Sequence, residues 1–519
     1  MHGFLMSQPP YYADNICSGN GPNLNSAARG WSGTKVRPDA NRPNFAPPGY
    51  PTLHASCVYP ETKLPRGDAG QNDSGRTEPP FHSFYKQVGA DLGQRVMPEN
   101  SLHIFRTASK ETRKIIDEVN PYTSIKPKTD TTIQNVIENI KKRNQWSKIH
   151  TIDLSGRKMG ADDINLLKEV LPQCTSLTHL NLGNNNIQAV GIRHLAAALG
   201  QCPSLTHLYL GDNQINYKGM QHLAAVLGEC PSLTHLDLGY NNIKAEGMQR
   251  LAAVLGKCPS LAHLDICYNN ILAEGMKHLA AVLGQCPSLA HLHLAYNNIR
   301  AEGMKHLAAV LGQCPSLSRL KIAYNDIKDE GIGHLAAVLP QCASLAHLDL
   351  SNNEIKAEGM KRLAAVLGKC PSLAHIDLSM NNIQAADVQR IAEVLPQCTS
   401  LTHLDLGNNK IRAEGMQHLA AALGQCPSLT HLYLGDNQIN DEGMQNFAAV
   451  LGKCPSLTHL DLSFNKITHI GVKNMAQIFP RCPSLSSLHL GHNDFTETGA
   501  QEVQEFLRMK RVLPTDPKP

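Results

Sequence analysis

Hydrophobic positions recur along most of the chain with a period of 28 residues. From Ile149 onward, thirteen units follow one another without insertion or deletion, and the unit between Leu233 and Ser260 reads LTHLDLGYNNIKAEGMQRLAAVLGKCPS. Apolar residues alternate with other residues at the start of each unit. This alternation predicts a short strand at positions 3 to 7, counted from the first Leu, in which positions 4 and 6 face the core and positions 3, 5 and 7 face the concave side.

The second half of each unit has the period of a helix. Met248, Leu251 and Leu255 fall on one helical face at spacings of three and four. Gly256 is expected to take the C′ position that ends this helix, and Pro259 prevents the helix from continuing. Each unit is therefore predicted to be a strand, a turn, a helix and a turn. Because no such unit buries its apolar edge alone, the units are expected to stack into one body.

Two patterns in the repeat resemble a known family. Each unit follows L-x-x-L-x-L-x-x-N-x-I, and the helix follows G-x-x-x-L-A-x-x-L, as from Gly247 to Leu255. Residues 149 to about 507 thus resemble the ribonuclease-inhibitor class of leucine-rich repeats, as in ribonuclease inhibitor, the Ran GTPase-activating protein and the sensor domains of NOD-like receptors. The resemblance implies an α/β solenoid, a horseshoe of about thirteen units, with a parallel β-sheet on the concave face and helices on the convex face. Since inhibitors, activators and sensors share this fold, it does not name a function.

The segments outside the repeat have a different composition. Residues 1–107 contain 13 Pro and no sustained period, and they are predicted to form a disordered arm. Residues 108–148 carry apolar residues at spacings of three and four, which predicts two short helices that form an N-terminal cap. The solenoid is predicted to span residues 149–512, followed by a short tail at 513–519.

Composition and charge narrow the class of partner. The 519 residues have a formal net charge of +4, which is too mild for the concentrated basic surface of a nucleic-acid binder. No apolar run has the length of a membrane span or a signal peptide. These features predict a cytoplasmic protein with neither a nucleic-acid nor a membrane partner. Only 5% of the residues are aromatic, so an aliphatic core is expected.

Twelve of the 15 cysteines form a ladder with a step of 28 residues. Each lies three residues before the first Leu of a unit, at the corner between helix and strand. The ladder lacks the C-x-x-C pairing of a zinc site, so these cysteines are expected to pack as reduced thiols, with no metal and no cofactor. Cys17, Cys57 and Cys267 lie outside the ladder.

Histidine and aspartate also repeat. Ten units carry His at position 3, and seven carry Asp at position 5. Since neighbouring strands lie roughly 4.8 Å apart, a row of imidazoles beside a broken row of carboxylates is expected on the concave face. One interpretation is a surface that responds to pH or binds metal. The other is simple copying of the repeat, because residues 194–216 and 418–440 are identical.

The units that depart from the copied pattern provide the best candidates for partner binding. Two cations occupy positions 3 and 5 of one unit, four successive units carry Tyr at position 8, and two further aromatic or imidazole side chains are expected on the concave face. Tyr and Arg dominate the binding energy of many protein interfaces. The alternative is that the tyrosines merely cover the loop after the strand. The candidate residues are Arg319, Lys321, Tyr240, Tyr268, Tyr296, Tyr324, His293 and Tyr209.

The sequence favours a binding function over catalysis. It contains no G-x-x-x-x-G-K-[ST], G-x-S-x-G or H-E-x-x-H motif. The leading hypothesis is a non-enzymatic scaffold, sensor or inhibitor that binds a protein partner on the concave face. Thirteen strands would span roughly 58 Å, enough for a standard interface. One alternative is a regulator of a small GTPase that resembles the Ran GTPase-activating protein, and another is a microbial effector delivered into a host cell.

Overall fold

The computed structural model describes residues 123–127, 132–143, 146–454, 456–476, 482, 484–509 and 513–514. The predicted disordered arm, residues 1–107, lies outside these residues. So do the first of the two helices predicted for the cap and most of the predicted tail.

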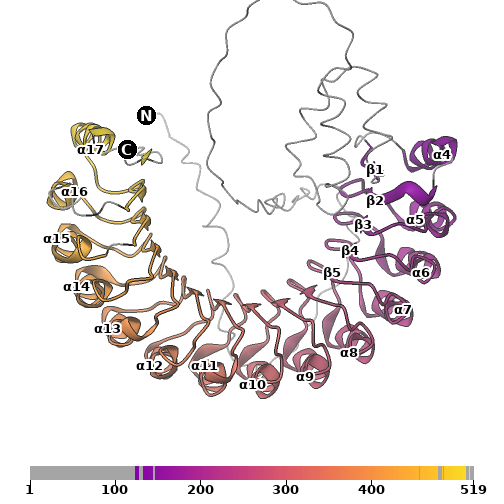
Figure 1. The fold of residues 1–519 in the computed structure, drawn as a ribbon, viewed down its shortest axis with the longest axis horizontal. Helices are drawn as coiled ribbons and strands as arrows, with labels where there is room; N and C mark the ends of the chain where they lie inside the picture. The colour runs from indigo at the N-terminus through magenta and orange to yellow at the C-terminus, as the bar shows by residue number, and fades with distance from the viewer. Residues whose placement is uncertain are drawn as a thin grey trace, which may run out of the picture. The chain divides into compact units, whose positions relative to one another are not determined.

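In the described part of the chain, fifteen parallel strands form one sheet and follow one another in sequence order. Equivalent residues pair across neighbouring strands, so that His235 lies opposite His263 and Asp237 opposite Asp265. The strands line the inner side of the arc of repeats, and the helices line its outer side (Figure 1). This arrangement confirms the predicted solenoid. The strands are β1 (Thr123–Ile125), β2 (Ile149–Asp153), β3 (His179–Asn181), β4 (His207–Tyr209), β5 (His235–Asp237), β6 (His263–Asp265), β7 (His291–His293), β8 (Arg319–Lys321), β9 (His347–Asp349), β10 (His375–Asp377), β11 (His403–Asp405), β12 (His431–Tyr433), β13 (His459–Asp461), β14 (Ser487–His489) and β15 (Leu513–Pro514).

The repeat strands are shorter than the sequence predicted, because they end at position 5 rather than position 7. The reason is the backbone at position 8, which enters the left-handed region, as at Tyr240 with φ 54°. Pairing with the next unit nevertheless continues into this turn. The N–H of Tyr240 donates to the carbonyl of Cys267 at 2.8 Å. Positions 4 and 6 face the core as predicted, for example Leu236 and Leu238.

One helix follows the strand in each unit. The predicted apolar face is buried, as Met248, Leu251 and Leu255 illustrate. Three helices end early where Leu-Pro-Gln replaces the usual Leu-Gly, because proline cannot continue the hydrogen-bonding pattern, and a short 3-10 turn follows. The helices are α4 (Ile133–Arg143), α5 (Ala161–Lys168), α6 (Gln188–Leu199), α7 (Tyr217–Leu227), α8 (Lys244–Leu255), α9 (Leu272–Leu283), α10 (Arg300–Leu311), α11 (Lys328–Ala336), α12 (Ala357–Leu367), α13 (Ala385–Ala392), α14 (Arg412–Leu423), α15 (Asp441–Leu451), α16 (His469–Ala476) and α17 (Glu497–Met509), with 3-10 turns η2 (Trp146–Lys148), η3 (Leu171–Gln173), η4 (Leu339–Gln341) and η5 (Leu395–Gln397).

The glycine that follows each typical helix does not take the predicted left-handed C′ conformation. Gly256 keeps right-handed helical angles, with φ −63° and ψ −14°, instead of the left-handed angles of a C′ glycine. A Cβ atom there would lie 2.7 Å from Oε1 of Gln285 in the next unit. The atom in the way is the flexible end of a side chain, so neither the backbone angles nor a rigid contact between units requires glycine at this position.

The asparagine at position 9 ties each unit to its neighbours, as the sequence suggested. Nδ2 of Asn297 donates to the carbonyls of Ile266 and Leu294, at 2.8 and 3.0 Å. Its Oδ1 accepts the N–H groups of Asn269 and Ile271. These contacts satisfy backbone groups that stacking removes from water.

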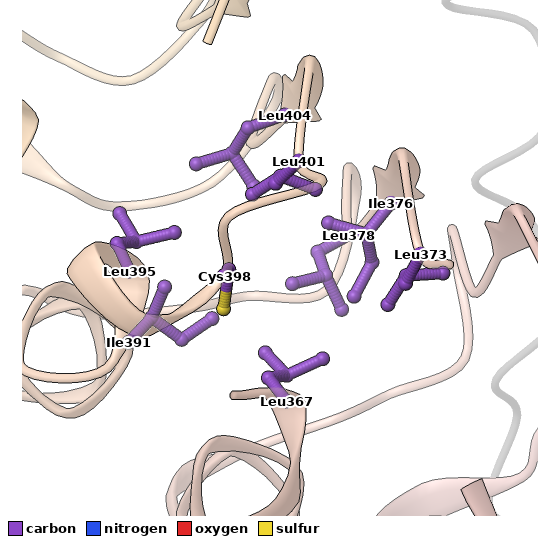
Figure 2. A pocket seen from close by; sticks show the side chains of 9 residues that line it. All are labelled: Leu367, Leu373, Ile376, Leu378, Ile391, Leu395, Cys398, Leu401 and Leu404. Carbon is purple, nitrogen blue, oxygen red and sulfur yellow. The ribbon is translucent and has the colours of Figure 1, made fainter. Parts of the chain in front are cut away.

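One continuous apolar core runs from Ile133 in α4 to Val503 in α17. A cavity of about 10 Å³ interrupts it, lined by side chains of three successive units (Figure 2). Such a volume corresponds to a single water-sized probe at most, and an apolar cavity of this size stays dry. Figure 2 therefore shows a small packing defect and not a ligand site. The lining residues are Leu367, Leu373, Ile376, Leu378, Ile391, Leu395, Cys398, Leu401 and Leu404.

The ladder cysteines pack at the predicted corner. None of the thirteen described cysteines, Cys267 included, forms a disulfide. Cys230 is buried, its Sγ lies 3.6 Å from the carbonyl oxygen of Val226, and burial raises its pKa to about 11. A thiol with such a pKa stays protonated and unreactive near neutral pH. Within the residues that the structure describes, every helix is too short or too polar to cross a lipid bilayer.

Candidate functional site

The four tyrosines at position 8 form one continuous stack, here called the Tyr row (Tyr240, Tyr268, Tyr296 and Tyr324). The centroids of successive rings lie 4.2, 3.8 and 3.9 Å apart, and the ring planes differ by 13 to 18°. The repeat itself sets this spacing, because each tyrosine follows a strand that pairs in register with the next. The exposed fractions of Tyr240 and Tyr268 are 42% and 36%, so a wide aromatic face is open to solvent.

The backbone of the Tyr row has an energetic cost. All four tyrosines have φ between 54° and 58°, a region that bulky side chains rarely occupy and that Asn and Asp tolerate better. Other units indeed carry Asn184, Asp212, Asn352, Asn408 and Asp436 at this position. Tyrosine in four successive units is thus not the low-cost choice for this turn. Ring stacking offsets part of the cost.

Small residues support the Tyr row from below. Cys267, Ala295 and Ala323 at position 7 form a separate buried cluster, and the rings of Tyr296 and Tyr324 pack against it. At the end of the row, the hydroxyl of Tyr324 donates to Sδ of Met380 at 3.1 Å. These contacts hold the Tyr row in place without a bound partner.

The two predicted cations lie on one strand, β8, with their side chains on the same face of the sheet. Arg319 interrupts the histidine row, and its guanidinium lies 3.5 Å from Nε2 of His347. Its buried Nε has no hydrogen-bond partner among the described residues. Lys321 stands in register between His293 and Asp349. This unit therefore brings positive charge to the middle of the concave face.

Histidines at position 3 form two rows of five, here called the histidine stacks, separated by Arg319. The eight pairs of neighbouring rings have centroids 3.6 to 4.1 Å apart, and six of them are stacked. His263 and His291 meet edge to face, and the rings of His347 and His375 are tilted by 46°. In several units a threonine donates its hydroxyl proton to a backbone carbonyl, as Thr206 does to Thr178 at 2.9 Å. The same oxygen is 2.8 Å from Nδ1 of His207, so Nδ1 must be the donor there and Nε2 carries no proton.

The histidine stacks favour the neutral imidazole. Burial lowers the pKa of His207 to about 3 and that of His403 to about 4, and the neighbouring histidines add to the effect. Near neutral pH these side chains are therefore uncharged. The hypothesis that the row binds metal or controls partner binding through pH stays a prediction.

The remaining two candidates lie on the floor of the sheet rather than in the Tyr row. Tyr209 stands on β4 with its ring 6.2 Å from that of His207. His293 on β7 pairs with Asp265 on β6, with 2.8 Å between Nδ1 and Oδ2. The eight residues thus divide between a ridge of four tyrosines and a floor that carries Arg319, Lys321, His293 and Tyr209.

Sequence reasoning missed several exposed large hydrophobic residues in the first half of the solenoid. Val190, Tyr217 and Leu272 have exposed fractions of 50%, 44% and 39%, and they lie after the strands of units two to five. A surface hollow of about 470 Å³ lies at the Tyr240 end of the row. The amide side chains around it include those of Gln188, Gln214, Asn216 and Asn242, and Val190 lies there too. Most units carry a polar residue at the positions of Val190 and Leu272. A comparison of the units would therefore have revealed both residues.

Three family models match the chain. The leucine-rich repeat domain of the MHP1/HER1/GIP3 family matches residues 210–353. A model of two leucine-rich repeats matches residues 174–220 and 427–474, and a single-repeat model matches 369–392, 397–420 and 481–503. No curated protein matches the chain in sequence.

Solved structures with a similar trace include three proteins of low identity. An internalin of Listeria monocytogenes is 22% identical, with 70% of this chain and 94% of that chain covered and a TM-score of 0.43. The yeast Rad7 and Elc1 complex gives 16% identity, 78% and 96% coverage and a TM-score of 0.43. A leucine-rich repeat protein of Leptospira interrogans gives 16% identity, 73% and 98% coverage and a TM-score of 0.39.

The 28-residue units, the asparagine row between them and the matches to repeat models agree with one another. The chain is therefore a leucine-rich repeat protein.

Proposed function

We propose that this protein is a non-enzymatic scaffold, sensor or inhibitor that binds a protein partner on its concave face, with the Tyr row as the centre of the interface. The observation that carries the proposal is the stack of four tyrosines at a backbone position that disfavours tyrosine. Simple copying of the repeat would place Asn or Asp at this position just as readily as Tyr. An aromatic ridge in four successive units therefore favours a task outside folding.

The surroundings of the Tyr row indicate what kind of partner fits. Tyr240 and Tyr268 offer apolar area with polar tips, and Arg319 offers a guanidinium whose buried Nε lacks a partner among the described residues. The hollow of about 470 Å³ beside Tyr240 is lined by amides that donate and accept hydrogen bonds. A protein segment with apolar side chains and at least one carboxylate complements this combination.

The finer assignments belong to the same proposal. Helices of 11 or 12 residues in most 28-residue units support the ribonuclease-inhibitor-like class. Thirteen free thiols in the described residues support a cytoplasmic location, since an oxidising compartment would threaten them. The proposal includes no cofactor, no nucleic acid and no membrane. Among the described residues, no contact favours the alternatives of a small-GTPase regulator or a delivered effector.

A capture experiment with matched variants tests the proposal. The test variant combines Tyr268→Asn, Tyr296→Asn and Arg319→His, so that each position receives the residue found there in other units. The fold should be unchanged. Proteins captured by the full chain from cell extract are quantified by mass spectrometry and confirmed with purified partner, and we expect this variant to weaken binding at least tenfold.

A control variant shows whether binding depends on the Tyr row itself or on any stack of rings at position 8. Phe464 and His492 occupy position 8 in two late units and stack with 4.2 Å between their ring centroids. The variant Phe464→Asn with His492→Asn removes an equivalent stack far from the Tyr row and should bind normally. If the test variant retains every partner, the interface lies elsewhere and the proposal fails.

A further inference from the structure

Two unrelated departures from the repeat meet at one point of the concave face. Position 7 carries Gly, Ala or Ser in the other described units but Cys267 in one, and position 5 of the next unit carries His293 where Asp is commonest. Both side chains lie beside Asp265 of β6. Copying of a unit explains the ladder cysteines and the histidine rows. It does not explain why a unique cysteine and an unusual histidine adjoin the same carboxylate.

The three side chains offer a convergent set of metal ligands. One nitrogen of His293, Sγ of Cys267 and one carboxylate oxygen of Asp265 all lie within 4.8 Å of one another. In a tetrahedral zinc site the corresponding donor atoms are roughly 3.4 to 3.6 Å apart, as the usual bond lengths require. Small side-chain rotations therefore suffice to close the site. The backbone needs no movement, because paired strands already fix both units.

A missing side chain leaves room beside the cluster. The nearest atoms to a Cβ built on Gly239 would be Sγ of Cys267 at 2.9 Å, Oδ1 of Asp265 at 3.2 Å and Oδ1 of Asp237 at 3.3 Å. All three atoms face the same space. Asp237 or a water molecule is thus available as a fourth ligand.

The local charge favours a cation. Asp265 and Asp237 stand in register on neighbouring strands, so two carboxylates lie side by side and repel one another. Lys321, in register with His293, is the nearest cation along the sheet. A divalent ion between the carboxylates and the thiol would relieve this repulsion.

We propose that Asp265, Cys267 and His293 bind one divalent transition-metal ion, for which zinc has the matching ligand chemistry. On binding, the Cys267 thiol gives up its proton to solvent and becomes a thiolate ligand, and Nδ1 of His293 binds in its unprotonated form. The ion bridges the units that begin at Leu261 and Leu289. Because Cys267 belongs to the buried cluster against which Tyr296 packs, the ion would stiffen the Tyr row, but its binding does not depend on the proposed partner.

Cobalt is a spectroscopic probe for this site. The full chain is purified under reducing, metal-free conditions and titrated with Co²⁺, and then with Zn²⁺ as competitor. We expect a thiolate-to-cobalt charge-transfer band with the visible bands of four-coordinate cobalt, both removed by zinc. The Cys267→Ala variant should lack the charge-transfer band and bind at least tenfold more weakly.

Matched variants make the outcome decisive. Alanine is already present at the same position as Ala295 and Ala323, and asparagine as Asn181 at the position of His293, so Cys267→Ala and His293→Asn should fold. The ladder variant Cys286→Ala removes a thiol of the same unit and should keep the band. Absence of a thiolate band in the full chain, or an equal band in Cys267→Ala, overturns the proposal.

Discussion

At the residue scale, the asparagine at position 9 satisfies backbone groups that the stacking of units buries. Asn297 is fully buried, and its amide group bonds to backbone groups of the preceding unit and of its own unit. Loss of such an amide strands several buried donors and acceptors at once. Each unsatisfied group costs about 1 to 3 kcal/mol.

The variant Asn297→Ala should therefore lower the free energy of unfolding by about 2 to 4 kcal/mol, measured by urea unfolding followed by circular dichroism. The matched control is Asn242→Ala, because Asn242 is exposed to solvent. Its effect should stay below about 0.5 kcal/mol. Equal effects of the two substitutions would contradict the role given to the buried amide.

Single residues also mark where sequence reasoning stopped. The consensus identified the buried asparagines, since a polar residue recurs among apolar ones. It did not reveal that Tyr240 and its equivalents take left-handed backbone angles, because hydrophobic periodicity carries no information on φ. Asn and Asp at the same position in other units were the available signal. The Asp265, Cys267 and His293 cluster was missed because its members belong to two units.

At the element scale, the helices of successive units pack against one another, and in most units a glycine in the first turn of the helix allows the contact. A Cβ on Gly303 of α10 would lie 3.1 Å from Cα of Ala273 in α9 and closer still to Ile299. The neighbouring atom is backbone and cannot move aside. Gly333 in α11 differs, because the atoms in its way belong to the flexible end of Arg362.

These two glycines should respond oppositely to alanine. Gly303→Ala should destabilise the fold by about 1 to 3 kcal/mol, since overpacking pushes the helices apart. Gly333→Ala should be neutral or stabilising by up to about 1 kcal/mol, because alanine favours the helix and Arg362 can move. Thermal and urea unfolding of both variants provide the test. Stabilisation by Gly303→Ala would show that the helices do not pack as described.

Elements within the repeat were predictable, and so was α4 in the N-terminal cap, while the two terminal strands were not. The helices and the inward positions of the strands follow from a period that recurs thirteen times. β1 and β15 extend the sheet beyond the repeat through backbone pairing alone. Such pairing leaves no hydrophobic period in a segment of two or three residues, so Thr123–Ile125 and Leu513–Pro514 carried no signal.

At the scale of the whole molecule, the histidine stacks couple folding to pH. Seven histidines have pKa values lowered to about 3 or 4 by burial and mutual repulsion, whereas an unfolded histidine titrates near 6.5. Their contribution to stability is therefore complete above pH 6.5 and is lost as the pH falls toward 4. Asp237 and Asp405, with pKa values raised to about 6 and 7, act in the opposite direction. The seven are His207, His235, His291, His347, His375, His403 and His431.

Because the histidines outnumber the two carboxylates, unfolding near pH 5 should take up protons, on the order of two or more per chain. The urea midpoint should accordingly fall between pH 7.5 and pH 5. The variant His375→Ser, His403→Ser and His431→Ser interrupts the second stack with the residue that Ser487 already provides at this position. It removes three of the protonation sites, so its stability should depend less steeply on pH. If the variant and the natural chain lose stability in parallel, groups other than these three imidazoles govern the acid response.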